Sequence, residues 1–282
     1  MNTTACDGRW AVILCGGRGS RLGSISKTTP KALVNVHGHP ILWYSFWTLY
    51  KAGFRNFIFP LGYKGEMIKD YIDELSKGMG CQILAVDTGE DTSIAKRIHQ
   101  IAHLIPENED FFLINSDTIF DFDIEGMYQT HREKNALLTL SSVEVVSSWG
   151  LIMVKDDEIY GFDRQRKVRH LVSDGHKGMY GLVNSGLAWL NKDALNYADL
   201  NTCGDFETNV YQKLINLKRV AHYEIHGLWF PIDTQKDLQV INLEIDDAED
   251  LNKHANSAMM SRDLLASYAA ETRKNDVSKT KV

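Results

Sequence analysis

Cysteine is scarce in this chain of 282 residues, and the few cysteines stand far apart. Cys6, Cys15, Cys81 and Cys203 form no C-x-x-C pair. Structural zinc sites and disulfide frameworks both use cysteines at short, recurring spacings, so neither is indicated. This cysteine usage favours a reducing, cytoplasmic location.

Long apolar runs are also missing. The longest, Trp10–Cys15 and Phe111–Ile114, have the length of strands and fall far short of the roughly 18–20 residues that cross a bilayer. Met1–Arg9 does not combine a basic region with an apolar segment. We therefore expect neither a secretory signal nor a membrane partner.

An excess of basic residues is likewise absent. The chain has 31 Lys and Arg against 37 Asp and Glu, which gives a formal net charge of −6. General nucleic-acid binding has no electrostatic basis in such a chain, although a local basic pocket stays open. With 44% hydrophobic residues, 21 glycines and 5 prolines, the composition excludes collagen-like and wholly disordered proteins and is typical of a globular one.

The first half of the chain alternates short apolar runs with helical patterns. Buried strands are predicted at Trp10–Cys15, Asn56–Pro60, Gln82–Val86 and Phe111–Ile114. Helices are predicted at Ile41–Ala52, Glu66–Ser76 and Ser93–Ile105. Apolar strands that alternate with helices predict an α/β fold with a Rossmann-like, mostly parallel mixed sheet and helices on both faces. Ligands of such sheets bind at the carboxyl ends of the strands.

The second half changes character. Longer, partly alternating strands are predicted at Asn135–Val146, Gly150–Val154, Ile159–Asp163 and Val183–Leu190, as a β-rich insertion. Asp205–Asn216 is predicted to be helical, and Trp229–Asp233 to form a strand edge. We expect one main domain over residues 1–245. A helical tail over residues 246–282 follows, and its end is polar enough to be disordered.

The strongest local motif is the glycine-rich loop after the first predicted strand. It reads CGGRGSRL over residues 15–22, and PKAL follows over residues 30–33. Glycines after a buried strand let backbone N–H groups converge on phosphate oxygens. Arg21 adds a guanidinium fork for those oxygens, and Lys31 adds a mobile charge. Leu22 stands where a dinucleotide fingerprint needs glycine, and no Gly-Lys-Ser/Thr run of a P-loop exists.

Two carboxylates follow apolar runs far apart in the sequence. Asp117 comes directly after FFLINS, and Asp233 lies in WFPIDT. Taken alone, each is read more simply as a helix cap. Together with a phosphate loop, the pair predicts that an Mg²⁺ cofactor is clamped on a triphosphate.

These motifs together resemble the sugar-phosphate nucleotidyltransferase (nucleotide-sugar pyrophosphorylase) family, from about Trp10 to Leu243. The glucose-1-phosphate cytidylyltransferase branch is most similar. The segments that carry this resemblance are HPILW at 39–43, GYKG at 62–65, VDTG at 86–89 and W-x-PIDT at 229–234. The run TPKALV at 29–34 also resembles phosphocholine cytidylyltransferases.

The resemblance implies a reaction and a set of partners. An NTP, here CTP, and a small phosphorylated acceptor would give a CDP-linked product and pyrophosphate. The acceptor is expected to be a sugar 1-phosphate or a related phosphate or phosphonate. The fold would be of the nucleotide-diphospho-sugar transferase type, its insertion would bind the acceptor, and the enzyme would form a homo-oligomer.

The resemblance also implies roles for single residues. Arg21 and Lys31 would be catalytic, and Asp117 and Asp233 would bind Mg²⁺. The nucleotide would be bound by Leu14, Cys15, Gly16, Gly17, Gly19, Ser20, Arg97 and Ser116. The acceptor would be bound by Arg164, Asn184 and Glu207.

The chain departs from the cytidylyltransferase pattern on both sides of this core. The Thr-Gly-Gly-Arg run of that branch is Ile94-Ala95-Lys96-Arg97 here, so only Arg97 matches. The same chemistry with GTP or UTP and a heptose or hexose phosphate is therefore an alternative. The Glu-Lys pair of the acceptor site is Asp163-Arg164 here. Because the acceptor side is altered, a catalytically silent nucleotide-sensing subunit is the second alternative.

Overall fold

The central element of the fold is a seven-stranded sheet. A computed structural model of the chain describes residues 8–146, 151–155, 158–163, 167–168, 170–171, 180–197 and 206–242. Along the sheet the strands are β16 (Val220–Glu224), β8 (Leu138–Val143), β15 (Val183–Asn191), β6 (Asp110–Asn115), β1 (Trp10–Leu14), β4 (Asn56–Leu61) and β5 (Gln82–Asp87). The predicted helical tail over residues 246–282 lies outside the described residues.

Strand direction confirms the predicted mixed, mostly parallel sheet. β1 pairs in parallel with both β4 and β6, and only β15 runs antiparallel to its neighbours. The register brings four strand ends into one row, because Cys15 is bridged to Leu61, Leu61 pairs with Asp87, and the Ser116 N–H donates to the Leu14 carbonyl at 3.2 Å. The loops that follow β1, β4, β5 and β6 therefore meet at one edge.

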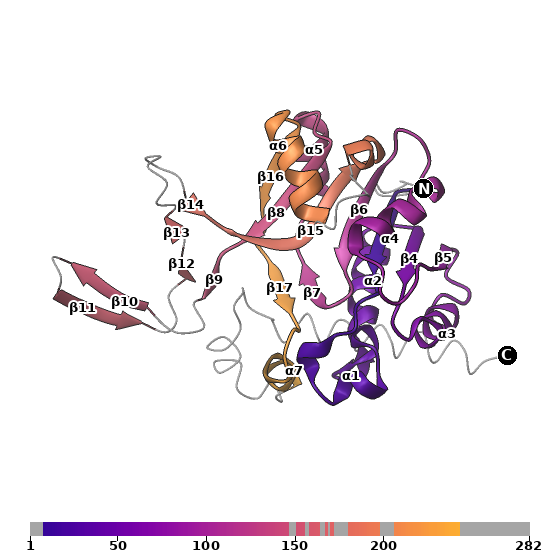
Figure 1. Cartoon of the computed structure of the whole chain (residues 1–282), viewed down its shortest axis with the longest axis horizontal. Coiled ribbons are helices and arrows are strands. Elements are labelled where there is room, and N and C mark those ends of the chain that lie inside the picture. Colours follow the sequence, from indigo (N-terminus) through magenta and orange to yellow (C-terminus); the bar gives the residue numbers. More distant parts are fainter. Residues whose placement is uncertain are drawn as a thin grey trace.

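Helices cover both faces of the sheet, as predicted (Figure 1). They are α1 (Ile25–Thr28), α2 (Ile41–Lys51), α3 (Gly65–Leu75), α4 (Ile94–Ile101), α5 (Ile124–Glu133), α6 (Gln212–Asn216) and α7 (Gln235–Asn242). Along β1, Ala11 and Ile13 belong to a core shared with α2, α3 and α5, whereas Val12 belongs to a core shared with α4 and α6. Such two-sided burial explains why β1 has no polar residue.

The helices and strands differ from the prediction mainly at their ends. Ser93 caps α4 by accepting a hydrogen bond from the Lys96 N–H at 3.4 Å, but α4 gives way to a 3₁₀ turn at Ala102–Leu104. The helix predicted from Asp205 is described from Phe206 and opens with a π-helical turn at Glu207–Tyr211. The remaining 3₁₀ turns are Ser20–Leu22, Lys31–Leu33 and Lys192–Tyr197. The helices α1, α5 and α7 and the strands β7 (Thr118–Asp121) and β16 are among the elements that were not predicted.

The predicted β-rich insertion is confirmed only between β8 and β15. Two of its four predicted strands, Asn135–Val146 and Val183–Leu190, supply β8 and β15 of the main sheet instead. The described strands of the insertion form the pairs β9 (Val145–Val146) with β12 (Lys167–Val168), β10 (Leu151–Lys155) with β11 (Glu158–Asp163), and β13 (His170–Leu171) with β14 (Tyr180–Gly181). Figure 1 shows the β10–β11 hairpin projecting away from the main sheet. Whether this insertion binds the acceptor stays a prediction.

Two further strand pairs flank the sheet. β2 (Asn35–Val36) pairs with β3 (His39–Pro40), and β7 (Thr118–Asp121) pairs with β17 (Leu228–Pro231). β17 thus ends at Pro231, two residues before the end of the strand that was predicted at Trp229–Asp233. Among the described residues, no helix is long and apolar enough to cross a membrane.

Candidate active site

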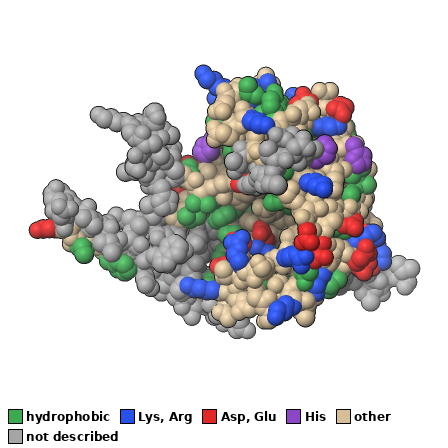
Figure 2. Space-filling view, viewed as in Figure 1, with side chains coloured by type: hydrophobic (Ala, Val, Ile, Leu, Met, Phe, Trp, Pro, Cys, Tyr) green, Lys and Arg blue, Asp and Glu red, His purple; other side chains and the backbone are tan. Residues whose placement is uncertain are grey.

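A cavity of about 550 Å³ lies at the edge where the loops after β1, β5 and β6 meet. It is lined by Leu14, Cys15, Gly16, Gly17, Arg18, Gly19, Ser20, Arg21, Lys31, Ala32, Glu90, Asp91, Thr92, Ile94, Arg97, Asn115, Ser116, Asp117 and Asp233. The structure therefore brings together every residue predicted to be catalytic, nucleotide-binding or metal-binding. Figure 2 shows the hollowed face, where basic and acidic side chains border the opening.

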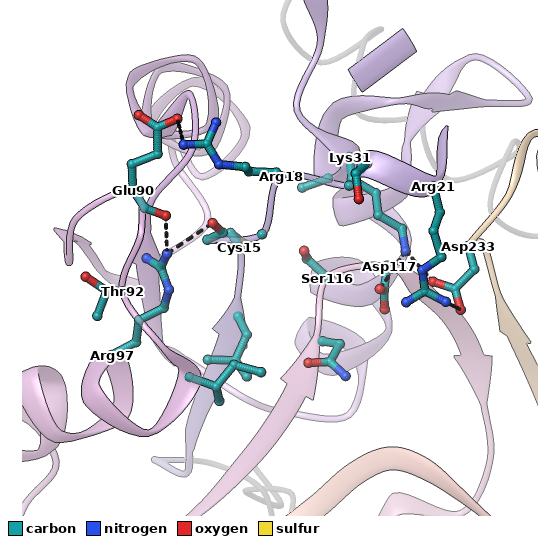
Figure 3. A pocket seen from close by; sticks show the side chains of 18 of the residues that line it. Cys15, Arg18, Arg21, Lys31, Glu90, Thr92, Arg97, Ser116, Asp117 and Asp233 are labelled. Carbon is teal, nitrogen blue, oxygen red and sulfur yellow. Dashed lines mark hydrogen bonds and ion pairs between the residues drawn. The ribbon is translucent and has the colours of Figure 1, made fainter. Parts of the chain in front are cut away.

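The glycine-rich loop is shaped by its contact with Lys31. Gly19 has a φ of +62°, in the left-handed region that favours glycine. A Cβ at Gly19 would lie 2.8 Å from the Lys31 Cβ, so a larger residue would also push the two segments apart. After Gly19 the chain makes the 3₁₀ turn Ser20–Leu22 and buries the Leu22 side chain. This turn directs Arg21 toward Asp233 (Figure 3).

The charged centre of the cavity is a cluster of two cations and two carboxylates. The Lys31 Nζ lies 2.7 Å from an oxygen of Asp117 and 2.7 Å from an oxygen of Asp233. Arg21 donates from Nη1 to the other oxygen of Asp233 at 3.0 Å. Only 13% of the Lys31 side chain is exposed, against 72% for Arg21. Lys31 is thus held in place, while Arg21 reaches out into solvent.

Strand pairing explains how two carboxylates 116 residues apart in sequence come together. β7 begins directly after Asp117, and β17 ends just before Asp233. Thr118 is paired with Pro231, and the Ile232 N–H donates to the Asp117 carbonyl at 2.9 Å. The pairing of two short strands therefore fixes the spacing of the predicted metal ligands.

The donor set fits Mg²⁺ only when a substrate shares the ion. Within the described residues, no three His, Cys, Asp or Glu side chains are grouped so that they could hold a metal. Mg²⁺ is commonly bound by one or two carboxylates, with substrate phosphates and water completing its shell. Asp117 and Asp233 both contact the Lys31 ammonium, and they supply the carboxylates for such a shared site.

The opposite end of the cavity is bordered by an exposed ion-pair cluster. Arg18 contacts Glu90 at 2.8 Å and Asp91 at 2.9 Å through its Nη2, and its guanidinium lies 5.2 Å from the centre of the Tyr63 ring. The glycine-rich loop is thereby joined to the loop that follows β5. Figure 3 shows the pair of Arg18 and Glu90 on the far side of the cavity from Lys31.

Arg97 borders the cavity, but its guanidinium is directed into the protein. Its side chain is buried, and its two terminal nitrogens donate to four oxygens of the protein. Burial lowers the pKa of Arg97, and attraction by Asp87 and Asp91 opposes this change. The direct nucleotide contact predicted for Arg97 stays a prediction. The terminal nitrogens of its guanidinium already donate to protein oxygens.

Cys15 lies at the end of β1 with its thiol buried. Burial, aided by the nearby charge of Asp117 and opposed by a hydrogen bond with Ser116, raises the pKa of the thiol to about 12. A thiol with this pKa is protonated at neutral pH and is a poor nucleophile. The site therefore offers no activated cysteine for covalent catalysis at this position.

Of the predicted acceptor residues, Asn184 and Glu207 are described, and neither lines the main cavity. Asn184 donates from Nδ2 to an Oε1 of Glu207 at 3.2 Å, so this predicted pair is in contact. Asn184 also lines a second cavity of about 350 Å³ with Leu140, Ser141, Ser142, Leu182 and His222. Arg164 lies outside the described residues.

Several lining residues were not predicted as part of the site. Arg18 belongs to the glycine-rich motif and Asn115 directly precedes Ser116, so the sequence could have indicated both. Glu90, Asp91 and Thr92 follow the predicted third strand without any motif. Their place at the end of a parallel strand was the available signal.

The comparisons with known proteins identify the family. A family model described as nucleotidyl transferase matches residues 10–248. The chain belongs to the nucleotidyl transferase family. The match spans the whole described sheet and both predicted metal ligands, and it confirms the sugar-phosphate nucleotidyltransferase resemblance.

Curated relatives include proteins that transfer different nucleotides. A "probable glucose-1-phosphate cytidylyltransferase" of Bacillus subtilis is 30% identical over 251 residues, which cover 82% of this chain and 94% of the relative. The glucose-1-phosphate cytidylyltransferase of Salmonella typhimurium is 26% identical over 247 residues, 80% of this chain and 92% of the relative. A mannose-1-phosphate guanylyltransferase catalytic subunit beta of Xenopus tropicalis is 27% identical over 230 residues, 80% of this chain and 62% of the relative.

Solved structures share the fold. The inositol-1-phosphate CTP transferase of T. maritima superposes with a TM-score of 0.57 at 17% identity, covering 89% of this chain and 98% of that one. HddC of Yersinia pseudotuberculosis gives a TM-score of 0.59 at 22% identity, over 82% of this chain and 96% of that one. The chain therefore has the nucleotide-diphospho-sugar transferase fold that the sequence predicted.

Proposed function

We propose that this nucleotidyltransferase joins CTP to a small phosphorylated acceptor, a sugar 1-phosphate or a related phosphate or phosphonate, and releases pyrophosphate. The observation that carries the proposal is the Lys31 ammonium, 2.7 Å from Asp117 and 2.7 Å from Asp233 beside the glycine-rich loop. A triphosphate needs cations and N–H donors at one end of its pocket, and this end of the cavity supplies both.

The reaction requires positioning and charge neutralisation rather than a covalent enzyme intermediate. An acceptor phosphate oxygen attacks the α-phosphorus, and the bond from that phosphorus to the bridging oxygen of pyrophosphate breaks in line. Lys31 neutralises charge that develops around the α-phosphorus, and Arg21 binds the leaving pyrophosphate. Backbone N–H groups of the glycine-rich loop hold the nucleotide phosphates.

Asp117 and Asp233 are the residues that would hold Mg²⁺, whose chemistry here is to neutralise triphosphate oxygens. Because Lys31 contacts both carboxylates, its ammonium holds them in position for a cation. The two carboxylates and Lys31 therefore act as one unit.

The choice of CTP rests on the curated relatives. Two of them are named as glucose-1-phosphate cytidylyltransferases, and this chain spans more than nine tenths of their lengths. The guanylyltransferase relative is matched over 62% of its length. The acceptor is proposed to lie toward Asn184 and Glu207, because the cavity beside Asn184 opens along the same edge of the sheet.

Pyrophosphate release tests this function. The purified chain is incubated with Mg²⁺, one of CTP, UTP, GTP or dTTP, and acceptors that include glucose 1-phosphate, heptose phosphates, phosphocholine and phosphonates. We expect release with CTP and one acceptor. Release with another NTP only would reassign the base. No release with any pair, while CTP still raises the melting temperature, would favour the nucleotide-sensing alternative over an enzyme.

A further inference from the structure

We propose that Arg97 is the positioning residue of the phosphate-binding loop, which it holds from beneath without touching the reacting atoms. The inference rests on the proposed nucleotide site and adds a residue that determines its shape. It is carried by the hydrogen bonds of one guanidinium and by the space that this group fills.

The Arg97 guanidinium joins three of the loops that meet at the sheet edge. Nη1 donates to the Leu61 carbonyl at 2.8 Å and to the Thr88 hydroxyl at 2.6 Å. Nη2 donates to the Gly16 carbonyl at 3.2 Å and to the Glu90 carbonyl at 3.0 Å. These acceptors lie at or after the ends of β4, β5 and β1, so one side chain connects three elements that are not consecutive in the sequence.

The bond to Gly16 sets the direction of the next peptide N–H. In a planar trans peptide, the C=O and the N–H point to opposite sides. The Gly16 carbonyl is turned into the protein, where it accepts from Arg97 and also from the Tyr63 N–H at 3.3 Å. The Gly17 N–H of the same peptide unit must then point the other way, toward the cavity that Gly17 lines. Arg97 thus prepares a phosphate donor that it does not itself contact.

The neighbouring glycines leave the room that Arg97 occupies. A Cβ at Gly16 would lie 2.3 Å from the Arg97 Cζ, and a Cβ at Gly62 would lie 2.5 Å from its Nη1. Any side chain at either position would therefore displace the guanidinium. Gly16 and Gly62 belong to two of the loops that Arg97 joins, so their small size and the arginine form one packing unit.

The charge of Arg97 adds to its geometric role. Three of its four acceptors are backbone carbonyls and the fourth is a hydroxyl, so among the described residues no carboxylate is hydrogen-bonded to its terminal nitrogens. A buried positive charge beneath the loop raises the local affinity for an anion above it. Because Asp87 and Asp91 offset part of this charge, the shape of the loop remains the main contribution of Arg97.

Three variants separate this role from a general structural one. Arg97→Met removes the fork and the charge, and Arg97→Lys keeps the charge without the fork. The matched control is Arg55→Met, because Arg55 also donates to two backbone carbonyls, of Tyr50 at 2.8 Å and Phe54 at 2.7 Å, and does not line the cavity. The measurements are kcat, the KM for CTP, the KM for the acceptor and the melting temperature.

We expect Arg97→Met to raise the KM for CTP by about tenfold or more, as loss of charge-assisted hydrogen bonds implies, with kcat and the acceptor KM within about threefold. Arg97→Lys should fall in between, and Arg55→Met should change only the melting temperature. An unchanged KM for CTP in Arg97→Met would overturn the proposal. If Arg97→Met lowered only kcat, as a smaller fraction of folded protein would, and changed neither KM, the proposal would also be overturned.

A second variant covers the case in which Arg97→Met does not fold. Arg97→Lys serves here, because it keeps the charge and much of the packing but loses the fork, so it should raise the KM for CTP in the same direction by a smaller factor. Calorimetric binding of inorganic pyrophosphate and of CTP reports on the loop without turnover. If the wild-type chain releases no pyrophosphate, the proposed function fails. Weaker binding in Arg97→Met or Arg97→Lys than in Arg55→Met would still support the role of Arg97, and equal binding would reject it.

Discussion

At the residue scale, the Lys31 ammonium lies between two carboxylates, 2.7 Å from each. Lys31→Ala should lower turnover by about 10²-fold or more, because it removes charge stabilisation that is needed in the transition state. The control is Lys192→Ala. Lys192 is exposed to a similar extent, 14% against 13%, and is paired with Glu107 away from the cavity. Steady-state rates with both substrates saturating measure the effect, and a wild-type rate in Lys31→Ala would remove Lys31 from the mechanism.

Asp117 gives the second residue-scale prediction, which concerns the metal. Asp117→Asn should abolish Mg²⁺-dependent turnover and weaken Mn²⁺ binding in the presence of CTP, because a neutral amide is a poorer ligand for a divalent cation. Mn²⁺ binding is measured by electron paramagnetic resonance. Asp121→Asn is the control, since Asp121 is an exposed residue at the far end of β7. Undiminished Mn²⁺ binding in Asp117→Asn would reject Asp117 as a ligand.

At the element scale, the start of α7 holds Asp233 in place. Asp237 accepts hydrogen bonds from the N–H of Asp233 at 3.1 Å and from the N–H of Thr234 at 2.7 Å, and its own N–H donates to the Thr234 hydroxyl at 3.2 Å. This reciprocal pattern is a capping box, with the acidic residue three positions after the cap. The helix is thereby joined to the residue that the proposed metal site uses.

Asp237→Ala should therefore affect both stability and the site. Loss of a cap costs about 1 kcal/mol of folding free energy, and a less restrained Asp233 should raise the KM for CTP severalfold. Asp123→Ala is the matched control, because Asp123 caps α5 through the Gly126 N–H at 2.8 Å and lies outside the cavity. Urea unfolding and steady-state kinetics measure the two effects. Equal KM values in both variants would show that α7 does not position Asp233.

The elements also show what the sequence alone could predict. β1, β4 and β6 are apolar along almost their full length, and their burial from both sides makes that pattern unambiguous. β16 (VAHYE) mixes polar and apolar residues because it lies at the edge of the sheet, so its pattern was too weak to predict a strand. α5 was missed because only Ile124, Met127 and His131 are buried along it.

The candidate site divides in the same way. Gly16, Lys31, Asp117 and Asp233 stand in or beside motifs, so their meeting could be expected from strand order. The contact of Arg18 with Glu90 and Asp91 could not be expected in this way. It joins loops more than 70 residues apart and depends on how far each loop extends beyond the sheet. The turn of Arg97 beneath the loop likewise depends on space left by Gly62, which no local pattern encodes.

At the scale of the whole molecule, a buried polar cluster connects elements at the amino-terminal end of β6, opposite the end that borders the cavity. Asp110, at the start of β6, is buried and accepts hydrogen bonds from Asn191 at 2.9 Å and Arg132 at 3.2 Å, with His131 at 3.4 Å. Burial alone would raise the pKa of Asp110, but the hydrogen bonds from these three residues outweigh it and lower the pKa to about 2. β6, β15 and α5 are thus joined through one carboxylate.

The lowered pKa makes this cluster a source of acid sensitivity. A carboxyl whose pKa is lower in the folded state stabilises the fold fully above its unfolded pKa, near 3.8, and the stabilisation is lost as the pH falls toward about 2. The contribution is about 2 kcal/mol of unfolding free energy. We expect wild-type stability to fall over this pH window by that amount more than in Asp110→Asn, as measured by urea unfolding at each pH.

Asp73→Asn is the control for this measurement, because Asp73 pairs with Lys69 on the exposed face of α3 and ties no two elements together. It should follow the wild-type pH dependence. If Asp110→Asn does so as well, the carboxylate does not contribute to the stability of the sheet edge. Because the cluster lies at the amino-terminal end of β6 and the cavity at its carboxyl end, Asp110→Asn should leave the KM for CTP unchanged at neutral pH. Stability and substrate binding would then be assigned to opposite ends of the same strand.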